Sequence, residues 1–207
     1  DNPINFLQDK GFMAKIKFEP INHMSDIDII LSDEEKQKII NGDSISENII
    51  KRIINDHVRT QKVILRTIAE AQNPNNKIIL YAPDVKQAIA ICSFLKNKKL
   101  KAEAITAKTP SIFRRENIRK FKETNEVQIL VNYQVLTMGF DAPMANVAVI
   151  ARPTDSLVLY LQMVGRVARG EKQGGNKFCK VITVVDQRYG FRDFSEAFNF
   201  WEDIWQT

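Results

Sequence analysis

The sequence is poor in the residues that build metal sites and membrane spans. Only two of its 207 residues are cysteine and two are histidine. Cys92 and Cys179 each lie in an apolar run, which indicates a reduced, cytoplasmic setting, and the histidines show no ligand spacing, so no metal site is expected. No apolar stretch reaches the roughly 18 residues of a membrane span, and no signal peptide is recognisable. Because the chain starts at Asp1 without an initiator methionine, we expect a fragment of a longer protein.

The overall composition is that of a mildly basic globular protein. Hydrophobic residues make up 44% and charged residues 27% of the chain, both ordinary values. A net charge of +5 and a pI near 9.1 favour a polyanionic partner such as nucleic acid, although most proteins of this charge are simply well solvated. The length fits one large α/β domain, or one domain with an appended segment.

From Lys77 onward, short apolar strands alternate with helical segments. Two helix starts carry local signals: Asp84 has Gln87 three residues later, and Thr109 precedes a proline at the first helical position. This alternation predicts an α/β fold with a mainly parallel sheet covered on both faces, whose ligands bind beyond the carboxyl ends of the strands. The strands are expected at residues 77–82, 102–106, 127–131, 147–151 and 181–185.

Residues 1–76 differ and are expected to be largely helical. Capping boxes begin at Ser32 and Ser44, and the second predicts one long helix over residues 45–71. Its basic residues would face either a nucleic acid or solvent. Four aromatic residues spaced helically between 194 and 205 indicate a helix packed on its own domain, with a platform for stacked bases as the alternative. The basic residues of the long helix are Lys51, Arg52, Arg59, Lys62 and Arg66.

Residues 162–169, Gln-Met-Val-Gly-Arg-Val-Ala-Arg, are the most informative stretch. The run predicts a helix that ends near Gly170 and is apolar enough to be buried. On that helix Gln162, Arg166 and Arg169 would share one stripe. Two guanidinium groups on a buried helix need an anionic partner, and their planar forks suit multi-oxygen anions. The alternative is a pair of salt bridges to carboxylates of the same domain.

Three blocks together resemble a known family. Residues 132–143 contain Gly-Phe-Asp-Ala-Pro, residues 151–154 read Ala-Arg-Pro-Thr, and residues 162–169 have the form Q-x-x-G-R-x-x-R. They resemble motifs V and VI of the second RecA-like lobe of superfamily 2 helicases and translocases, and residues 78–90 resemble motif IV. The resemblance implies a three-layer RecA-like P-loop NTPase fold. It divides the chain into an N-terminal linker and helical segment, 1–76, and a C-terminal RecA-like domain, 77–207.

The resemblance assigns roles near the nucleotide. Arg166 and Arg169 match the motif VI arginines, which face the γ-phosphate of ATP across the cleft between lobes. A guanidinium there neutralises charge on the transferred phosphoryl group. Gln162 matches the opening glutamine of the motif, and Gly139 and Asp141 match a motif V pair near the ribose. For Asp141 a turn or cap aspartate is the alternative.

The resemblance also implies nucleic-acid contacts, although less specifically. Thr106 and Lys108 follow a predicted strand where relatives contact phosphates, and a polar loop without such a role is the alternative. Tyr133 stands where many relatives carry a threonine that touches the nucleic-acid backbone. This departure puts that contact in doubt, although the tyrosine hydroxyl or ring could serve instead.

Two nucleotide-binding elements are missing from the chain. No G-x-x-x-x-G-K-[ST] loop is present to cradle phosphates and place magnesium, and no Asp-Glu-x-x box follows an apolar strand. In this family both belong to the first lobe. ATP and Mg²⁺ would therefore be bound mainly by a first lobe of the same polypeptide. The chain then corresponds to the C-terminal lobe of an ATP-dependent DNA helicase or translocase, inactive as an ATP hydrolase by itself.

Other functions stay open at this point. RNA could replace DNA as the partner, or the motor could be a restriction-type translocase that moves duplex without separating strands. A non-catalytic nucleic-acid-binding module with the same fold is a further alternative. A metabolic dinucleotide enzyme is disfavoured because no G-x-G-x-x-G follows any predicted strand.

Overall fold

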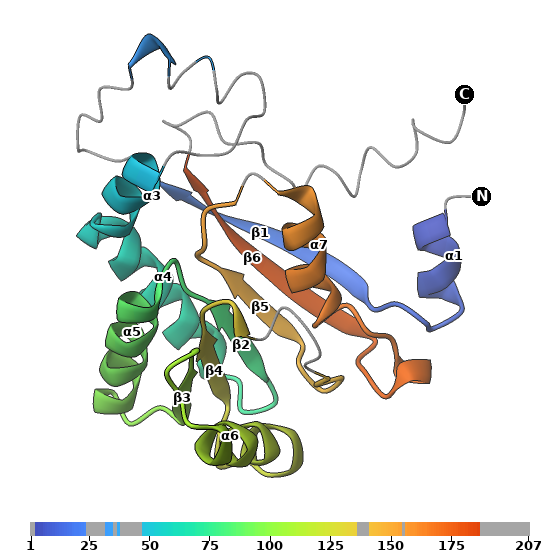
Figure 1. Ribbon diagram of the computed structural model, residues 1–207. Coiled ribbons are helices and arrows are strands. Elements are labelled where there is room, and N and C mark those ends of the chain that lie inside the picture. The colour runs from blue at the N-terminus through green and yellow to red at the C-terminus, as the bar shows by residue number, and fades with distance from the viewer. Residues whose placement is uncertain are drawn as a thin grey trace.

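Six parallel strands form one sheet in the order β1-β6-β5-β2-β4-β3 (Figure 1). The structure is a computed structural model that describes residues 3–23, 32–34, 37, 47–135, 141–154 and 156–186. Five of the strands lie where the apolar runs predicted them, so the parallel α/β sheet is confirmed. The strands are β1 (Lys15–His23), β2 (Ile78–Tyr81), β3 (Ala102–Ile105), β4 (Ile129–Asn132), β5 (Val147–Ile150) and β6 (Phe178–Asp186).

Helices cover both faces of the sheet and make a three-layer molecule. Side chains of successive strand residues point to opposite faces. On β2, Ile78 and Leu80 pack with α4 and α5, whereas Ile79 and Tyr81 pack with α6 and α7. All four side chains are at most 2% exposed, so the strands are buried from both sides, as expected for a parallel sheet. These helices are α4 (His57–Ala71), α5 (Val85–Asn97), α6 (Ser111–Glu123) and α7 (Leu157–Gly165).

Strand β1 was not predicted, because its segment was expected to be helical. It pairs with β6 along its whole length, from Lys15 opposite Phe178 to His23 opposite Asp186. Its pattern is polar and half-exposed, and Pro20 interrupts it. A proline is tolerated there because β1 lies at the edge of the described sheet, where one side needs no hydrogen-bond donor. The domain boundary at residue 76 stays a prediction, and β1 extends the sheet across it.

The prediction of one long helix over residues 45–71 is wrong, because the segment forms two separate helices. The first is α3 (Glu47–Ile54), and α4 begins again at His57. Between them Asp56 has an extended backbone, and its carboxylate accepts the N–H of Arg59 at 3.0 Å. An aspartate that caps a new helix competes with continuation of the previous one. The capping boxes at Ser32 and Ser44 each include a residue outside the described part of the chain.

Two further helix starts were predicted with different success. Asp84 caps α5 as expected, since its carboxylate accepts the N–H of Gln87 at 2.6 Å. The expected cap at Thr109 is wrong: α6 is preceded by Pro110, without a side-chain cap, and the Thr109 hydroxyl accepts the N–H of Thr106 instead, at 3.0 Å. The Thr109 hydroxyl is therefore engaged in the turn before the helix and does not cap α6.

Both cysteines are free and buried in the core. Burial raises the pKa of the Cys92 thiol to about 11 and that of Cys179 to about 12, so both are protonated at neutral pH. No helix among the described residues is long and apolar enough to cross a membrane.

Candidate functional site

The two arginines of the predicted stripe follow helix α7 rather than lie within it. The helix starts after Ser156, whose hydroxyl accepts a backbone N–H, and it ends at Gly165. Arg166 is the C-cap residue, still helical in backbone angles, so it remains one turn beyond the exposed Gln162. Gln162 and Arg166 therefore share a face as predicted. The predicted continuation to Arg169 is wrong.

Arg169 belongs to an extended segment that pairs with the N-terminal part of the chain. It forms an isolated antiparallel bridge with Met13, and the N–H of Ala14 donates to the carbonyl of Ala168 at 2.8 Å. Gly170 has an extended backbone, φ −81° and ψ 170°, rather than the left-handed one of a helix-ending glycine. Strand-like hydrogen bonds to a distant segment have replaced the last helical turn, which no local signal could indicate.

The structure brings together two residues that the sequence had assigned to different motifs. The guanidinium of Arg169 forms an ion pair with the carboxylate of Asp141. The Arg169 side chain is 27% exposed and that of Asp141 is 61% exposed. An ion pair this open to solvent contributes only about 0–1 kcal/mol. Arg169 can therefore exchange this carboxylate for another anion at small cost. Gly139, predicted to act beside Asp141, lies outside the described residues.

Arg166 is held differently, next to the core. It is half-buried near Tyr81, whose hydroxyl donates to the carbonyl of Met163 at 3.2 Å. Burial raises the pKa of Tyr81 well above its ordinary value, and the positive charge of Arg166 opposes that rise. Arg166 is thus positioned by the end of α7, whereas Arg169 is positioned by its pairing with Met13.

The predicted nucleic-acid residues Thr106 and Lys108 lie in a turn at the carboxyl end of β3. Thr106 is only 2% exposed, and its hydroxyl accepts the N–H of Lys108 at 3.2 Å. Arg114 of α6 braces the turn by donating to the carbonyls of Thr106 and Thr109, both at 3.2 Å. The Thr106 hydroxyl is therefore engaged within the turn, while the exposed Lys108 is free to meet solvent or a ligand.

Tyr133 lies at the carboxyl end of the neighbouring strand β4 and carries a partner that sequence reasoning missed. The guanidinium of Arg152, which follows β5, stacks over its ring at 5.2 Å from the ring centre. Both side chains are half-buried. The pair puts an aromatic face and a cation at the carboxyl ends of the strands, where ligands of parallel sheets bind. The available signal was the Ala-Arg-Pro-Thr block, in which the arginine follows an apolar strand.

A second arginine–aspartate pair is fully buried, between α4 and the end of β6. Arg59 donates to Asp186 with two nitrogens, at 2.8 and 2.9 Å, and both side chains are 2% exposed. Next to it His23 contacts Asp56 at 2.7 Å, also buried. Arg59 was predicted to face nucleic acid or solvent, and both interpretations are wrong for it. Its bidentate geometry and burial give it a structural role.

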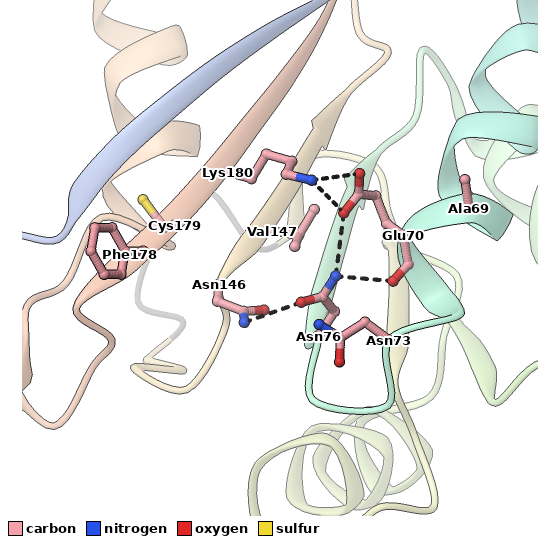
Figure 2. Close-up of a pocket in the computed structure, with 9 residues that line it drawn as sticks. All are labelled: Ala69, Glu70, Asn73, Asn76, Asn146, Val147, Phe178, Cys179 and Lys180. Carbon is pink, nitrogen blue, oxygen red and sulfur yellow. Dashed lines mark hydrogen bonds and ion pairs between the residues drawn. The ribbon is translucent and has the colours of Figure 1, made fainter.

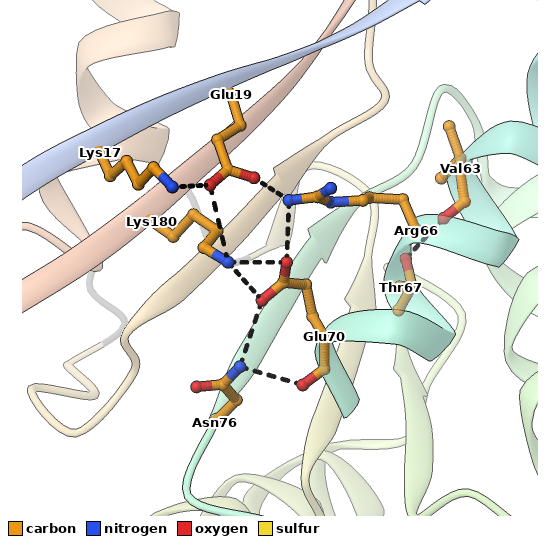
Figure 3. A network of polar contacts seen from close by, with 8 residues as sticks. All are labelled: Lys17, Glu19, Val63, Arg66, Thr67, Glu70, Asn76 and Lys180. Carbon is orange, nitrogen blue, oxygen red and sulfur yellow. Dashed lines mark hydrogen bonds and ion pairs between the residues drawn. The ribbon is translucent and has the colours of Figure 1, made fainter. Parts of the chain in front are cut away.

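The remaining basic residues of α4 also turn toward the protein. Arg66 forms ion pairs with Glu19 of β1 and with Glu70, and Lys180 of β6 donates to Glu70 at 2.8 and 2.9 Å (Figure 3). Lys62 donates to the carbonyl of Asn22 at 3.0 Å. These contacts tie α4 across β6 to the edge strand β1. They account for the basic character of the helix without a nucleic acid.

A pocket of about 470 Å³ adjoins this network near the amino ends of β5 and β6 (Figure 2). Its polar side chains bind each other: Asn76 donates to Glu70 at 3.2 Å and contacts Asn146 at 3.4 Å. The pocket lies at the amino ends of the strands, whereas Lys108 and Tyr133 lie beyond the carboxyl ends. Its polar groups are already engaged with one another, so the pocket is part of the structural network. Among the described residues, no cluster of three or more His, Cys, Asp or Glu could hold a metal ion.

The six-stranded parallel sheet covered by helices on both faces is the fold of a RecA-like helicase lobe. The chain matches the family described as helicase conserved C-terminal domain over residues 59–171. This chain belongs to that family, and it is the C-terminal RecA-like domain of a superfamily 2 helicase. The resemblance drawn from residues 132–143 and 162–169 is confirmed.

Individual relatives are longer than this chain. A 51.5 kDa protein of Lactococcus phage (isolate 7-9) is 32% identical over 141 residues, which make up 66% of this chain and 29% of the phage protein. The pre-mRNA-processing ATP-dependent RNA helicase PRP5 of Kluyveromyces lactis is 28% identical over 145 residues, 67% of this chain and 18% of PRP5. This chain thus spans less than a third of the length of either relative.

The fold is also similar to solved structures. A fragment assigned to the HsdR subunit of a type I restriction enzyme from Vibrio vulnificus YJ016 superimposes with a TM-score of 0.58. The match covers 91% of this chain and 34% of the fragment, at 20% sequence identity. At that identity the similarity concerns the fold alone.

Proposed function

We propose that this chain is the C-terminal lobe of an ATP-dependent DNA helicase or translocase and supplies arginine fingers to ATP hydrolysis. The observation that carries the proposal is the state of Arg169. Its guanidinium is partly exposed and bound only by the more exposed Asp141 among its described contacts. A finger must be held in place and still be able to leave its resting partner for a phosphate. The solvent-open pair meets both conditions.

In the proposed mechanism ATP is held by a first lobe and the two lobes close over it. The residues that would hold Mg²⁺ belong to that lobe, and the ion would supply positive charge to offset that of the phosphates. On closure Arg169 exchanges Asp141 for the γ-phosphate, and Arg166 approaches from the end of α7. Their charges stabilise the transferred phosphoryl group as negative charge develops on it. Gln162 and Asp141 would contact the nucleotide beside them, and Gly139 would allow close backbone approach.

The proposed nucleic-acid track runs along the carboxyl ends of β3, β4 and β5. Lys108 is exposed there for a phosphate, and the Tyr133–Arg152 pair offers a ring and a cation. Thr106 would contribute through the turn it stabilises, since its hydroxyl is buried. Contacts of this kind address the backbone and do not read bases. Binding should therefore be weak, salt-sensitive and nearly independent of sequence.

A duplex translocase or an RNA helicase is the second candidate. The relationship to PRP5, whose name describes an RNA helicase, favours RNA. A non-catalytic binding module would keep the fold without turnover. These candidates are distinguished by measuring ATP hydrolysis by the protein that joins this chain to a first lobe. The measurement is made separately with single-stranded DNA, duplex DNA and RNA, and the nucleic acid that stimulates hydrolysis most identifies the candidate.

The decisive test of the proposed function is Arg169→Ala in the protein that contains both lobes. Loss of an arginine finger reduces phosphoryl transfer by about 10³–10⁵-fold in related nucleotide hydrolases. We expect a loss of that order in turnover, measured by phosphate release, with a much smaller loss of ATP affinity. Arg169→Lys should not restore activity, because an ammonium lacks the planar fork. A folded Arg169→Ala protein with normal turnover would refute the finger.

The 207-residue chain by itself should not hydrolyse ATP, with or without DNA. It has no phosphate-binding loop, and its described residues offer no carboxylate cluster for magnesium. The measurement is steady-state phosphate release by the purified chain. Turnover that disappears in Arg169→Ala, and so belongs to the chain rather than to a contaminant, would contradict this expectation.

A further inference from the structure

The segment between α1 (Pro3–Asp9) and β1 runs antiparallel along the loop that carries Arg169. We call residues 11–14 the strap and residues 168–175 the arginine loop. Three backbone hydrogen bonds join them: Ala14 N–H to the Ala168 carbonyl at 2.8 Å, Gly170 N–H to the Phe12 carbonyl at 3.1 Å, and Lys172 N–H to the Gly11 carbonyl at 3.0 Å. Arg169 lies between the first two of these bonds.

The contact is so close that only glycine fits at Gly170. A Cβ at that position would lie 2.3 Å from the carbonyl oxygen of Gly11 and 2.7 Å from the backbone nitrogen of Met13. Both neighbours are backbone atoms, so they cannot turn aside as a flexible side chain could. A side chain at 170 must push the strap away from the arginine loop.

The far side of Arg169 is equally constrained. The carbonyl of Arg169 accepts the N–H of Asn176 at 3.0 Å. A Cβ at Gly175 would lie 2.1 Å from that same carbonyl oxygen. The Asn176 side chain donates to the carbonyls of Pro143 and Ala145, at 3.3 and 3.4 Å, in the segment that follows Asp141. The backbone of Arg169 is thus held from two sides, and one of them is the strap.

The strap is itself anchored to α1. The N–H groups of Phe12 and Met13 donate to the Leu7 carbonyl at 2.9 and 3.1 Å, and the Gln8 side chain donates to the Ala14 carbonyl at 3.2 Å. A pocket of about 210 Å³ separates parts of α1, the strap and the arginine loop. At its other end the strap is fixed by the core, because Ala14 is fully buried there and Met13 packs against it.

We propose that the strap and Gly170 are positioning elements for Arg169, which set where its guanidinium lies when the ATPase closes. Neither is assigned a nucleotide contact in the proposed mechanism. The inference rests on the proposed function, in which Arg169 meets the γ-phosphate. Catalytic groups must be held within about 0.5 Å of their productive position, and an error of about 1 Å can cost about 10²-fold in rate. A long, flexible arginine side chain meets that requirement only if its backbone is fixed.

The test is Gly170→Ala in the protein that contains both lobes. We expect ATP turnover to fall about 10- to 100-fold while the KM for ATP changes little, since the nucleotide contacts are untouched. Gly165→Ala is the matched control for folding, because a Cβ there meets nothing within 4 Å, and its melting temperature should not fall below that of the unmodified protein. Gly170→Ala with unchanged turnover overturns the proposal.

A double mutant separates positioning from general damage. If Gly170 acts through Arg169, adding Gly170→Ala to Arg169→Ala should cause no further loss in single-turnover hydrolysis at excess enzyme. A further loss equal to that of the single mutant overturns the proposal. Normal turnover in Arg169→Ala would instead refute the proposed function, so the two failures differ.

Gln8→Ala keeps the test decisive if Gly170→Ala does not fold. It removes the side-chain bond to the Ala14 carbonyl and introduces no clash. Asp9→Ala, at an exposed neighbour on the same helix, is the control. We expect a smaller but measurable loss of turnover in Gln8→Ala alone, with melting temperatures equal. Equal turnover in the two variants overturns the proposal.

Discussion

Two arginine–aspartate pairs of this lobe use the same chemical groups for different purposes. Arg59 and Asp186 are each 2% exposed and meet through two hydrogen bonds. Arg169 and Asp141 are 27% and 61% exposed. Water screens the second pair and supplies alternative partners, whereas both side chains of the first pair are shielded from water. Burial, and not residue type, therefore decides which pair stabilises the fold and which can be given up for a ligand.

The buried pair and the exposed pair also lie in different parts of the fold. Arg59–Asp186 joins helix α4 to the end of β6, inside the molecule. Arg169–Asp141 joins two segments outside the helices and strands. Buried charges without a partner are costly, so the first pair holds its elements in one arrangement. The comparison yields three predictions, since each substitution should cost stability in proportion to the burial of the pair it breaks.

The largest effect is expected from Arg59→Ala. It leaves the Asp186 carboxylate buried without its partner, which typically costs about 3–5 kcal/mol of unfolding free energy. Urea unfolding of the chain, followed by circular dichroism, measures the change. Arg59→Met combined with Asp186→Leu should recover most of the loss, because the unpaired charge is gone. A single mutant as stable as the original chain would show that the pair is not a stabilising contact.

Glu70 should show an intermediate effect that depends on pH. Burial alone would raise the pKa of its carboxyl, but hydrogen bonds from Lys180 and Arg66 outweigh burial and hold the pKa below its ordinary value of 4.5. Unfolding returns it toward 4.5, so the unfolded chain binds the proton more readily. The stabilisation is present above that value and is lost as pH falls through the lower, folded pKa.

Glu70→Gln removes this contribution. At neutral pH it should cost about 1.5–3 kcal/mol, the contribution of hydrogen bonds to a charged group. Unfolding free energies measured from neutral pH down to about pH 3 should fall less steeply than for the original chain. Glu123→Gln, at a side chain that is 63% exposed, is the matched control and should leave the slope nearly unchanged. Identical slopes for Glu70→Gln and the original chain would contradict the assignment.

The smallest loss of stability is expected from Asp141→Ala. Its pair with Arg169 is exposed, so the unfolding free energy should change by less than about 1 kcal/mol. If Asp141 contacts the nucleotide in the closed ATPase, the KM for ATP in the two-lobe protein should rise nonetheless. A loss of stability as large as that of Arg59→Ala would mean that the pair is structural and would remove the basis of the comparison.

Much of the fold could be predicted because its signals are local. Apolar runs of four to six residues located five of the strands, and the Asp84 cap located the start of α5. Strand β1 was missed because an edge strand shows polar alternation and tolerates Pro20. The break at Asp56 was missed because a strong helical pattern continues on both sides of it. The Tyr133–Arg152 pair was missed because it joins the ends of two strands.

The candidate site divides in the same way. The stripe of Gln162, Arg166 and Arg169 could be selected from helical spacing and from the suitability of arginine for phosphate, whereas Asp141 was selected by the resemblance to motif V. Their arrangement could not. The end of α7 at Gly165, the bridge from Arg169 to Met13 and its pair with Asp141 depend on segments far away in the chain.

The sequence by itself determined which chemical groups this lobe possesses. It also determined which segments become the strands and helices of the three-layer fold, because the spacing of apolar residues acts locally along the chain. Only the tertiary structure decided what each arginine does. Arg59 meets Asp186 across 127 residues in the dry interior, while Arg169 meets Asp141 in contact with water. The energy of an ion pair depends on the surrounding medium, and that medium is created by elements that assemble only when the whole chain has folded.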